Sequence, residues 1–251
     1  MKYGIVCAMP QEIALIEKDL RRSSSRTVAG RDFLEGELYG REVVLVMSRI
    51  GKVAAAMTAT LLLGVFGVDR ILLCGTAGGI APGLHVGDFV VGDRSVQHDF
   101  DASESGPFIV PLLDVAYFPS DAAMSDALFA AVEDYLHADF ARDVPEAHFR
   151  AFGITAPRVV RGVIASGDEF VCRRERREWL AENVEDIRCV EMEGAAMAQV
   201  CYEFGVPFAL IRVVSDGADD ASPVDFDVFV EEAASHFTRG VVKAYLSRAE
   251  D

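Results

Sequence analysis

The sequence predicts a single α/β domain in which helices wrap a mostly parallel sheet. Short apolar runs typical of buried strands alternate with segments of helical period, a pattern that favours parallel strands joined by helices. The 251 residues are 51% hydrophobic, which is enough to bury one large core. We therefore expect residues 1–251 to form one domain, with no second domain required.

The periodicity of each segment predicts its type. Runs rich in apolar and β-branched residues predict strands at 3–8, 42–48, 70–74, 88–92, 158–165, 189–190 and 207–214. Apolar residues at helical spacing predict helices at 11–21, 52–66, 121–137, 173–183, 192–204 and 225–246, with Ser120 as a cap for the third. The stretches 98–120 and 139–157 show neither period, and each could be a lid, a partner surface or an insertion.

Composition narrows the class of ligand. The formal net charge of −16, from 40 acidic and 24 basic residues, argues against nucleic acid, which proteins bind mainly through Lys and Arg. An uncharged or cationic ligand suits such a chain better. The longest apolar stretch, 53–68, contains Thr and Gly and is shorter than the roughly 20 residues of a membrane span. We expect a soluble, cytoplasmic protein whose five widely spaced cysteines are reduced core residues rather than disulfides or metal ligands.

Two carboxylates far apart in the chain each follow an apolar strand-like run. Glu12 stands in CAMPQEI and Asp216 in IRVVSDGADD. Ligands of α/β sheets lie beyond the carboxyl ends of the strands, so these acids are candidates for an acid/base pair. Ser215 could orient Asp216, and Arg212 could balance a local excess of acids. A helix cap at Ser215–Asp216 remains an alternative, weakened because the next helical period begins only near Asp225.

A glycine-rich segment, GTAGG at 75–79, follows the strand ILLC. Small residues allow backbone N–H groups to approach a ligand closely. The segment has neither the Lys of a phosphate-binding loop nor the spacing GxGxxG. A tight turn from a strand into a helix is the competing interpretation.

Two further segments carry side chains suited to a nucleoside. Glu191 and Glu193 flank Met192 just before the apolar stretch AAMAQVCYEF. Helix capping readily explains one of the two acids, whereas the other could accept hydrogen bonds from the vicinal hydroxyls of a ribose. Phe170, in SGDEFV after another strand, could stack on a flat ring or could simply belong to the core.

Together these segments closely resemble the 5′-methylthioadenosine/S-adenosylhomocysteine nucleosidases of the nucleoside phosphorylase superfamily. The resemblance covers nearly the whole chain and is carried by GIVCAMPQEI, SRIGKVAAAMTATLLL, CGTAGGIAPGLHVGDFVV, GVIASGDEFV, VEMEGAAMAQVC and VPFALIRVVSDGAD in that order. It implies a three-layer α/β/α sandwich with a mixed, mostly parallel sheet. It also implies a homodimer, no metal or organic cofactor, and hydrolysis of the N-glycosidic bond of adenine nucleosides.

The resemblance assigns a role to each candidate residue. Glu12 looks like the general base that activates water, and Asp216 like the general acid that protonates N7 of adenine. Glu193 would bind the ribose hydroxyls, with Met192 against the sugar and Glu191 beside it. The remaining positions would line the pocket or support it: Phe170, Val171, Thr76, Ala77 and Gly78 on the adenine and water side, Met9, Ile50 and Phe226 around the 5′ substituent, and Arg212 and Ser215 behind the carboxylates.

The resemblance does not identify the 5′ substituent of the substrate. Residues 98–120 do not resemble the family segment that reaches across the dimer to close the neighbour's 5′ pocket, and residues 139–157 resemble an insertion. An aminodeoxyfutalosine or futalosine nucleosidase is therefore an alternative. A purine nucleoside phosphorylase would need a cationic cradle for phosphate, and no Arg or Lys stands between Gly4 and Ile16. A catalytically inactive nucleoside-binding protein is another alternative, which the presence of Glu12, Glu193 and Asp216 disfavours. An apolar patch around 108–113 would be consistent with dimerisation.

Overall fold

The computed structural model describes residues 1–102 and 106–248. Residues 103–105, inside the irregular stretch 98–120, and residues 249–251 lie outside the described residues. The strands are β1 (Lys2–Cys7), β2 (Arg21–Val28), β3 (Arg31–Leu38), β4 (Arg41–Met47), β5 (Arg70–Gly79), β6 (Phe89–Gln97), β7 (Tyr117–Pro119), β8 (Val159–Ser166), β9 (Ile187–Glu191) and β10 (Phe208–Asp216). The helices are α1 (Pro10–Asp19), α2 (Lys52–Gly64), α3 (Ala122–Ala138), α4 (Phe140–Asp143), α5 (Glu146–Ala151), α6 (Arg174–Asn183), α7 (Gly194–Phe204), α8 (Ser222–Glu232) and α9 (Ala234–Arg248).

The described strands form one mixed sheet in the order β10-β6-β8-β9-β5-β1-β4-β3-β2, with β7 on β6. Parallel pairing joins β4, β1, β5 and β10, and also β6, β8 and β9. Strand β5 additionally pairs with β9 through Gly78 and Gly79, and β10 pairs antiparallel with β6, so these strands close a circuit. The carboxyl ends of β5 and β10 and the short strand β9 thereby meet at one place.

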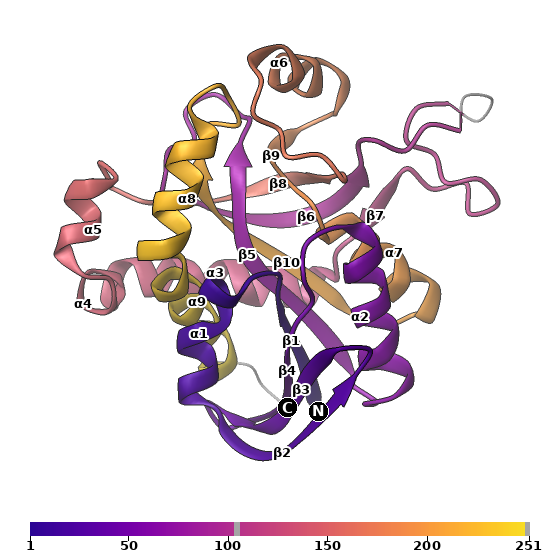
Figure 1. The fold of residues 1–251 in the computed structure, drawn as a ribbon, viewed down its shortest axis with the longest axis vertical. Helices are drawn as coiled ribbons and strands as arrows, with labels where there is room; N and C mark the ends of the chain where they lie inside the picture. Colours follow the sequence, from indigo (N-terminus) through magenta and orange to yellow (C-terminus); the bar gives the residue numbers. More distant parts are fainter. Residues whose placement is uncertain (103–105, 249–251) are drawn as a thin grey trace.

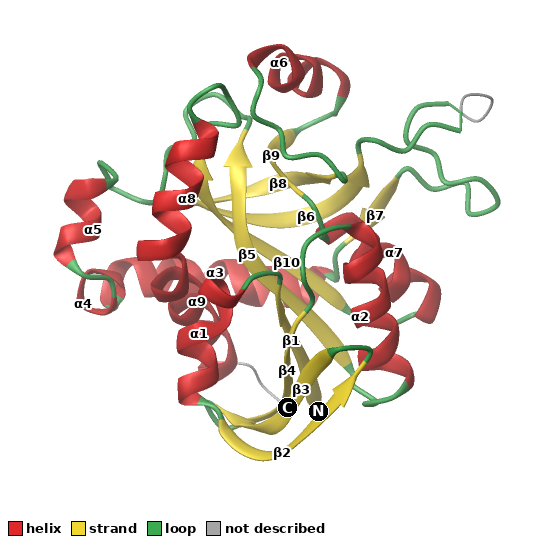
Figure 2. Ribbon diagram, in the orientation of Figure 1, coloured by secondary structure: helices red, strands yellow, loops and turns green. Residues whose placement is uncertain are grey.

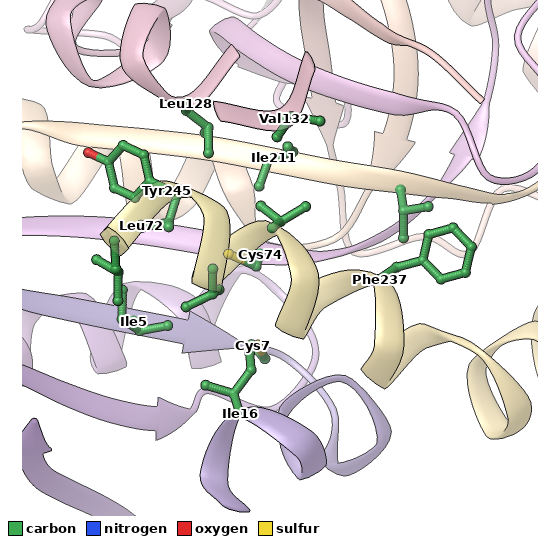
Figure 3. Close-up of a cluster of buried hydrophobic side chains, with 14 of the residues drawn as sticks. Ile5, Cys7, Ile16, Leu72, Cys74, Leu128, Val132, Ile211, Phe237 and Tyr245 are labelled. Carbon is green, nitrogen blue, oxygen red and sulfur yellow. The ribbon is translucent and has the colours of Figure 1, made fainter. Parts of the chain in front are cut away.

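Helices cover both faces of the sheet, which confirms the three-layer α/β/α prediction. Helices α1, α3 and α9 lie on one side, whereas α2 and α7 pack together on the other (Figure 1). On the first side Ile16 of α1 and Phe237 of α9 belong to one cluster of buried side chains with Ile5 and Leu72 of the sheet (Figure 3). On the second side Ala59 of α2 belongs to a separate cluster of buried side chains.

Several expected boundaries are wrong. Residues 21–38 form the hairpin β2–β3, which was missed because β2, RRSSSRTV, is an exposed edge strand with no apolar alternation. The predicted turn at 75–79 continues strand β5 to Gly79. The stretch 139–157 contains the short helices α4 and α5, and the expected closing helix is divided at Ala233 into α8 and α9 (Figure 2).

Side-chain environments correct two further expectations. Asp121, rather than Ser120, caps α3, since its carboxylate accepts a hydrogen bond from Met124 N at 2.8 Å. Phe108 is buried against Trp179, whereas Leu112 is 100% exposed, so only part of the patch expected at 108–113 lies on the surface. All five cysteines carry free thiols, and four of them are buried as expected. No helix within the described ranges is both long and apolar enough to cross a membrane.

Candidate active site

A pocket with about 530 Å³ of empty space opens where strands β1, β5, β8, β9 and β10 end. It is lined by the predicted residues Met9, Glu12, Ile50, Thr76, Ala77, Gly78, Phe170, Val171, Glu191, Met192, Glu193, Asp216 and Phe226. The two remaining predicted residues, Arg212 and Ser215, lie buried behind this lining. The structure therefore brings the candidate set together from segments spread over the whole chain.

Glu12 is buried in the first turn of α1, and its carboxylate accepts four hydrogen bonds. One oxygen accepts hydrogen bonds from Ala8 N at 2.9 Å and Met9 N at 3.1 Å. The other accepts from Thr76 N at 2.8 Å and from the Thr76 hydroxyl at 3.1 Å. The bond from Met9, the residue that caps α1, is also half of a capping box, so Glu12 has a structural role besides any catalytic one. Four donors fit an ionised carboxylate, which can only accept.

Arg212 supplies a buried positive charge behind the pocket. Its Nη2 pairs with Glu191, and with Glu193 Oε2 at 3.2 Å. A Cβ at position 75 would clash with Arg212 Nη1 and lie 2.7 Å from Glu12 Oε1, so a side chain there would displace both buried groups. Gly75 thus allows the Arg212 guanidinium to approach the carboxylates of Glu12, Glu191 and Glu193.

The two acids around Met192 have different surroundings. Glu191 caps α7, because its carboxylate accepts hydrogen bonds from Glu193 N at 3.1 Å and Gly194 N at 2.9 Å, and from the hydroxyl of Ser166. The carboxylate oxygens of Glu191 therefore already accept hydrogen bonds from donors of the protein. The expectation that capping explains one acid and not both is met, since the carboxylate of Glu193 makes no capping hydrogen bond.

Glu193 reaches into the pocket between a cation and a backbone donor. Its Oε1 accepts a hydrogen bond from Gly51 N at 2.9 Å, and its Oε2 lies beside Arg212. Burial and the neighbouring charge of Glu191 raise the pKa of Glu193, and Arg212 opposes this shift. A carboxylate that can accept further hydrogen bonds at this position can bind the hydroxyl groups of a ligand.

Asp216 ends β10 at a register shift against β5, opposite Gly78. One carboxylate oxygen accepts a hydrogen bond from Ala218 N at 2.9 Å, and the other lies 2.7 Å from the Ser215 hydroxyl. A Cβ at position 78 would lie 3.1 Å from Asp216 Oδ1, so a glycine leaves this oxygen room. Burial raises the pKa of Asp216, while hydrogen bonds from Ser222, Ser215 and Ala218 act in the opposite direction.

The other wall of the pocket is apolar. Phe170 is 42% exposed and meets the ring of Phe226 edge to face, with centroids 5.3 Å apart. Ile50 is 54% exposed at the mouth, and Met9 is partly buried. The partly open rings and the aliphatic chains can accept a flat base and an apolar substituent.

Sequence reasoning missed three lining residues: Ala8, Glu169 and Val190. Each is next or nearly next in the chain to a predicted residue, which is the signal that could have found it. Glu169 turns away to pair with Arg176 Nε at 2.8 Å. Within the described ranges no three His, Cys, Asp or Glu side chains are arranged to hold a metal ion.

The arrangement favours a reaction in which positive charge develops on the ligand. Four buried acids, Glu12, Glu191, Glu193 and Asp216, surround the pocket, and Arg212 approaches all of them except Asp216. None of the described residues lining the pocket is Lys or Arg. Such a site suits a ligand that becomes positively charged, and its described lining offers no cationic cradle for phosphate.

Comparison with known proteins gives one consistent family. The model of the phosphorylase superfamily matches residues 2–247. The 5′-methylthioadenosine/S-adenosylhomocysteine nucleosidase of Shewanella pealeana is 37% identical over 236 residues, which cover 94% of this chain and 95% of that protein. The crystal structure of the Neisseria meningitidis nucleosidase of that name, in complex with methylthio-immucillin-A, matches with a TM-score of 0.86 at 31% identity over 99% of both chains. A futalosine hydrolase of Helicobacter pylori matches with a TM-score of 0.84 at 29% identity, over 99% of this chain and 98% of that chain. The chain belongs to the 5′-methylthioadenosine/S-adenosylhomocysteine nucleosidase family of the phosphorylase superfamily.

Proposed function

We propose that this protein hydrolyses the N-glycosidic bond of 5′-substituted adenosines, namely 5′-methylthioadenosine, S-adenosylhomocysteine and 5′-deoxyadenosine, and releases adenine. The observation that carries the proposal is the placement of Glu12 and Asp216 along β5. Glu12 bonds to Thr76 and Asp216 lies opposite Gly78, two residues further on. Both acids also line the same pocket, so one ligand bound there can meet both of them.

Each acid then has one task. Glu12, ionised among its donors, takes a proton from the attacking water. Asp216, whose pKa is raised by burial, gives a proton to N7 of adenine, because adenine leaves poorly as an anion. Glu193 binds the ribose hydroxyls beside Met192, and the negative charges nearby stabilise the oxocarbenium-like sugar more in the transition state than in the ground state.

The apolar wall receives the rest of the substrate. Phe170 stacks on adenine, the backbone of Val171 bonds its edge, and Met9, Ile50 and Phe226 contain the 5′ substituent. A futalosine-type nucleoside is the second candidate, because the H. pylori futalosine hydrolase shares the fold over nearly the whole chain. That substrate would use the same acids and differ only at the 5′ end.

The assembly and cellular setting are part of the proposal. We propose a cytoplasmic homodimer that works without a metal or organic cofactor in nucleoside catabolism and methionine salvage. The exposed apolar side chains of Ile50 and Leu112 support a contact with a second copy. A phosphorolytic reaction is disfavoured by the lack of Lys and Arg among the described lining residues.

A substrate panel tests the proposed reaction. Purified protein is incubated with methylthioadenosine, S-adenosylhomocysteine, 5′-deoxyadenosine and aminodeoxyfutalosine, each with and without phosphate, and products are separated by chromatography. We expect adenine and the free 5′-substituted ribose, with no dependence on phosphate. A sugar 1-phosphate would mean a phosphorylase, turnover of aminodeoxyfutalosine alone would select the second candidate, and no turnover of any substrate would contradict an enzymatic role.

A further inference from the structure

At the edge of the pocket, the first residue of α2 and two loops are joined by a closed ring of hydrogen bonds among Lys52, Asp99 and Asp168, here called the rim ring. Lys52 Nζ donates to Asp99 Oδ1 at 2.6 Å. Asp168 N donates to Asp99 Oδ2 at 2.8 Å. Lys52 N donates to Asp168 Oδ1 at 2.8 Å and closes the ring. The three residues follow β4, β6 and β8, so the ring ties together segments that are distant in the sequence.

The ring joins the two halves of the pocket. Lys52 follows Gly51, whose N–H donates to Glu193 at 2.9 Å. Asp168 precedes Phe170 by two residues, in the loop that supplies the exposed aromatic ring. The ring therefore fixes the donor that holds Glu193 relative to the side chain that faces the base.

The geometry at Gly51 leaves little freedom. This residue precedes α2 with φ of 99°, a conformation that favours glycine, and a Cβ there would lie 3.1 Å from Asp168 Oδ1. The side chains of Lys52 and Asp99 are largely shielded from solvent. Burial acts to raise the pKa of Asp99, but the hydrogen bonds from Lys52 and Asp168 lower it overall, so Asp99 is held as an acceptor at neutral pH.

We propose that Asp99 and Asp168 are positioning residues that orient Glu193 toward the ribose through Lys52 and Gly51. Neither side chain lines the pocket, so both act through the loop that they hold. The inference rests on the proposed nucleosidase function, since it gives Glu193 the ribose as its ligand. It adds a part of the molecule, the rim ring, that controls how well the sugar is held during the reaction.

Conservative variants at the two positions have opposite expected effects. Asp168→Asn keeps an oxygen that accepts from Lys52 N, so kcat/KM for methylthioadenosine stays near that of the wild type. Asp99→Asn turns an amide nitrogen toward one of two donors, so kcat/KM falls on the order of tenfold, as it does for Asp168→Ala. The matched control is Asp126→Ala, which breaks an ion pair with Arg161 away from the pocket and leaves kcat/KM unchanged.

Analogues lacking the 2′- or the 3′-hydroxyl separate positioning from a general loss of structure. Suppose that the rim ring acts through Glu193. Asp168→Ala then lowers kcat/KM more for the parent nucleoside than for the analogue that lacks the hydroxyl bound by Glu193. Equal losses on all three nucleosides, or failure of Asp168→Asn to rescue, would overturn the inference.

Amide hydrogen exchange at Gly51 tests the ring without any substrate. We expect this N–H to exchange faster in Asp168→Ala than in the wild type, and at the wild-type rate in Asp168→Asn and Asp126→Ala. Unchanged exchange in Asp168→Ala would refute the role of the ring, whatever the activity of the protein. Failure of the wild type to cleave methylthioadenosine would count against the proposed function and not against the ring.

Discussion

The two ends of the pocket hold carboxylates that are equally buried and differently surrounded. Glu12 is 1% exposed and Asp216 2% exposed, so burial alone does not distinguish them. Glu12 meets four donors, with Arg212 close by. Asp216 meets the N–H of Ala218 and the hydroxyls of Ser215 and Ser222, and no Lys or Arg in the described chain pairs with it. The partners, rather than the depth, indicate which acid is ionised.

The Ser215 hydroxyl has two acceptors within reach, so it does not serve an ionised Asp216 alone. Its oxygen lies 3.2 Å from Ala77 O and 2.7 Å from Asp216 Oδ2, two acceptors in reach of a single proton. If Ser215 donates to the carbonyl of Ala77, a proton on Asp216 satisfies the second contact. The same pair of contacts leaves an ionised Asp216 competing with Ala77 for one donor.

The largest expected effect is the loss of turnover on replacing either acid. Asp216→Asn removes the proton donated to adenine, and Glu12→Gln removes the base that activates water. Each positioned proton transfer is worth about 10²–10⁴ in rate, so kcat falls by that order in each variant. Adenine release measured under saturating substrate checks both values, and near-wild-type kcat in either variant would refute the role given to that residue.

Thermal stability of the same two variants sharpens the comparison. An Asn at 216 can accept from Ala218 and donate to Ser215, as a protonated Asp216 does, so we expect its Tm to stay at or above that of the wild type. A Gln at 12 must turn its amide nitrogen toward Ala8 and Met9 or toward Thr76, which are donors, so its Tm should fall. Similar Tm shifts for the two variants would mean that their surroundings are equivalent.

A smaller effect, on stability, is expected when the cation behind the pocket is removed. Arg212→Met leaves the buried carboxylates of Glu191 and Glu193 without their counter-charge, which costs about 3–5 kcal/mol of unfolding free energy. The matched control is Arg161→Met, which breaks the more exposed pairs with Asp93 and Asp126 and costs less than about 1 kcal/mol. Urea unfolding measures both, and equal costs would show that the buried pairs contribute no more than the surface ones.

The sequence predicted the parts of the molecule that have a local signal. Alternating apolar runs gave the layers, and acids placed just after such runs gave Glu12 and Asp216. The excess of acids around Met192 indicated that one of them serves a ligand, and the structure leaves Glu193 for that task because Glu191 caps α7. The resemblance assigned the proposed roles.

Contacts between distant segments could not be predicted in this way. The requirement for glycine at 75 arises only when Arg212 arrives from β10, which pairs with β5. The rim ring likewise joins Lys52, Asp99 and Asp168 from three separate segments of the chain, and each is an ordinary charged residue when viewed alone. The edge strand β2 lacks an apolar face, so its pairing with β3, rather than its own pattern, makes it a strand.

The smallest expected effect is a pH dependence of stability that belongs to Asp216. Its pKa is raised in the folded state by burial, so between the ordinary value of 3.8 and the raised value the folded protein retains a proton that the unfolded chain releases. The unfolded state binds fewer protons there, and stability therefore falls as pH rises through this window. Asp216→Asn lacks this dependence. We expect its unfolding free energy, relative to the wild type, to increase with pH across the window and then level off, whereas a constant difference from acid to neutral pH would mean that Asp216 titrates alike in both states.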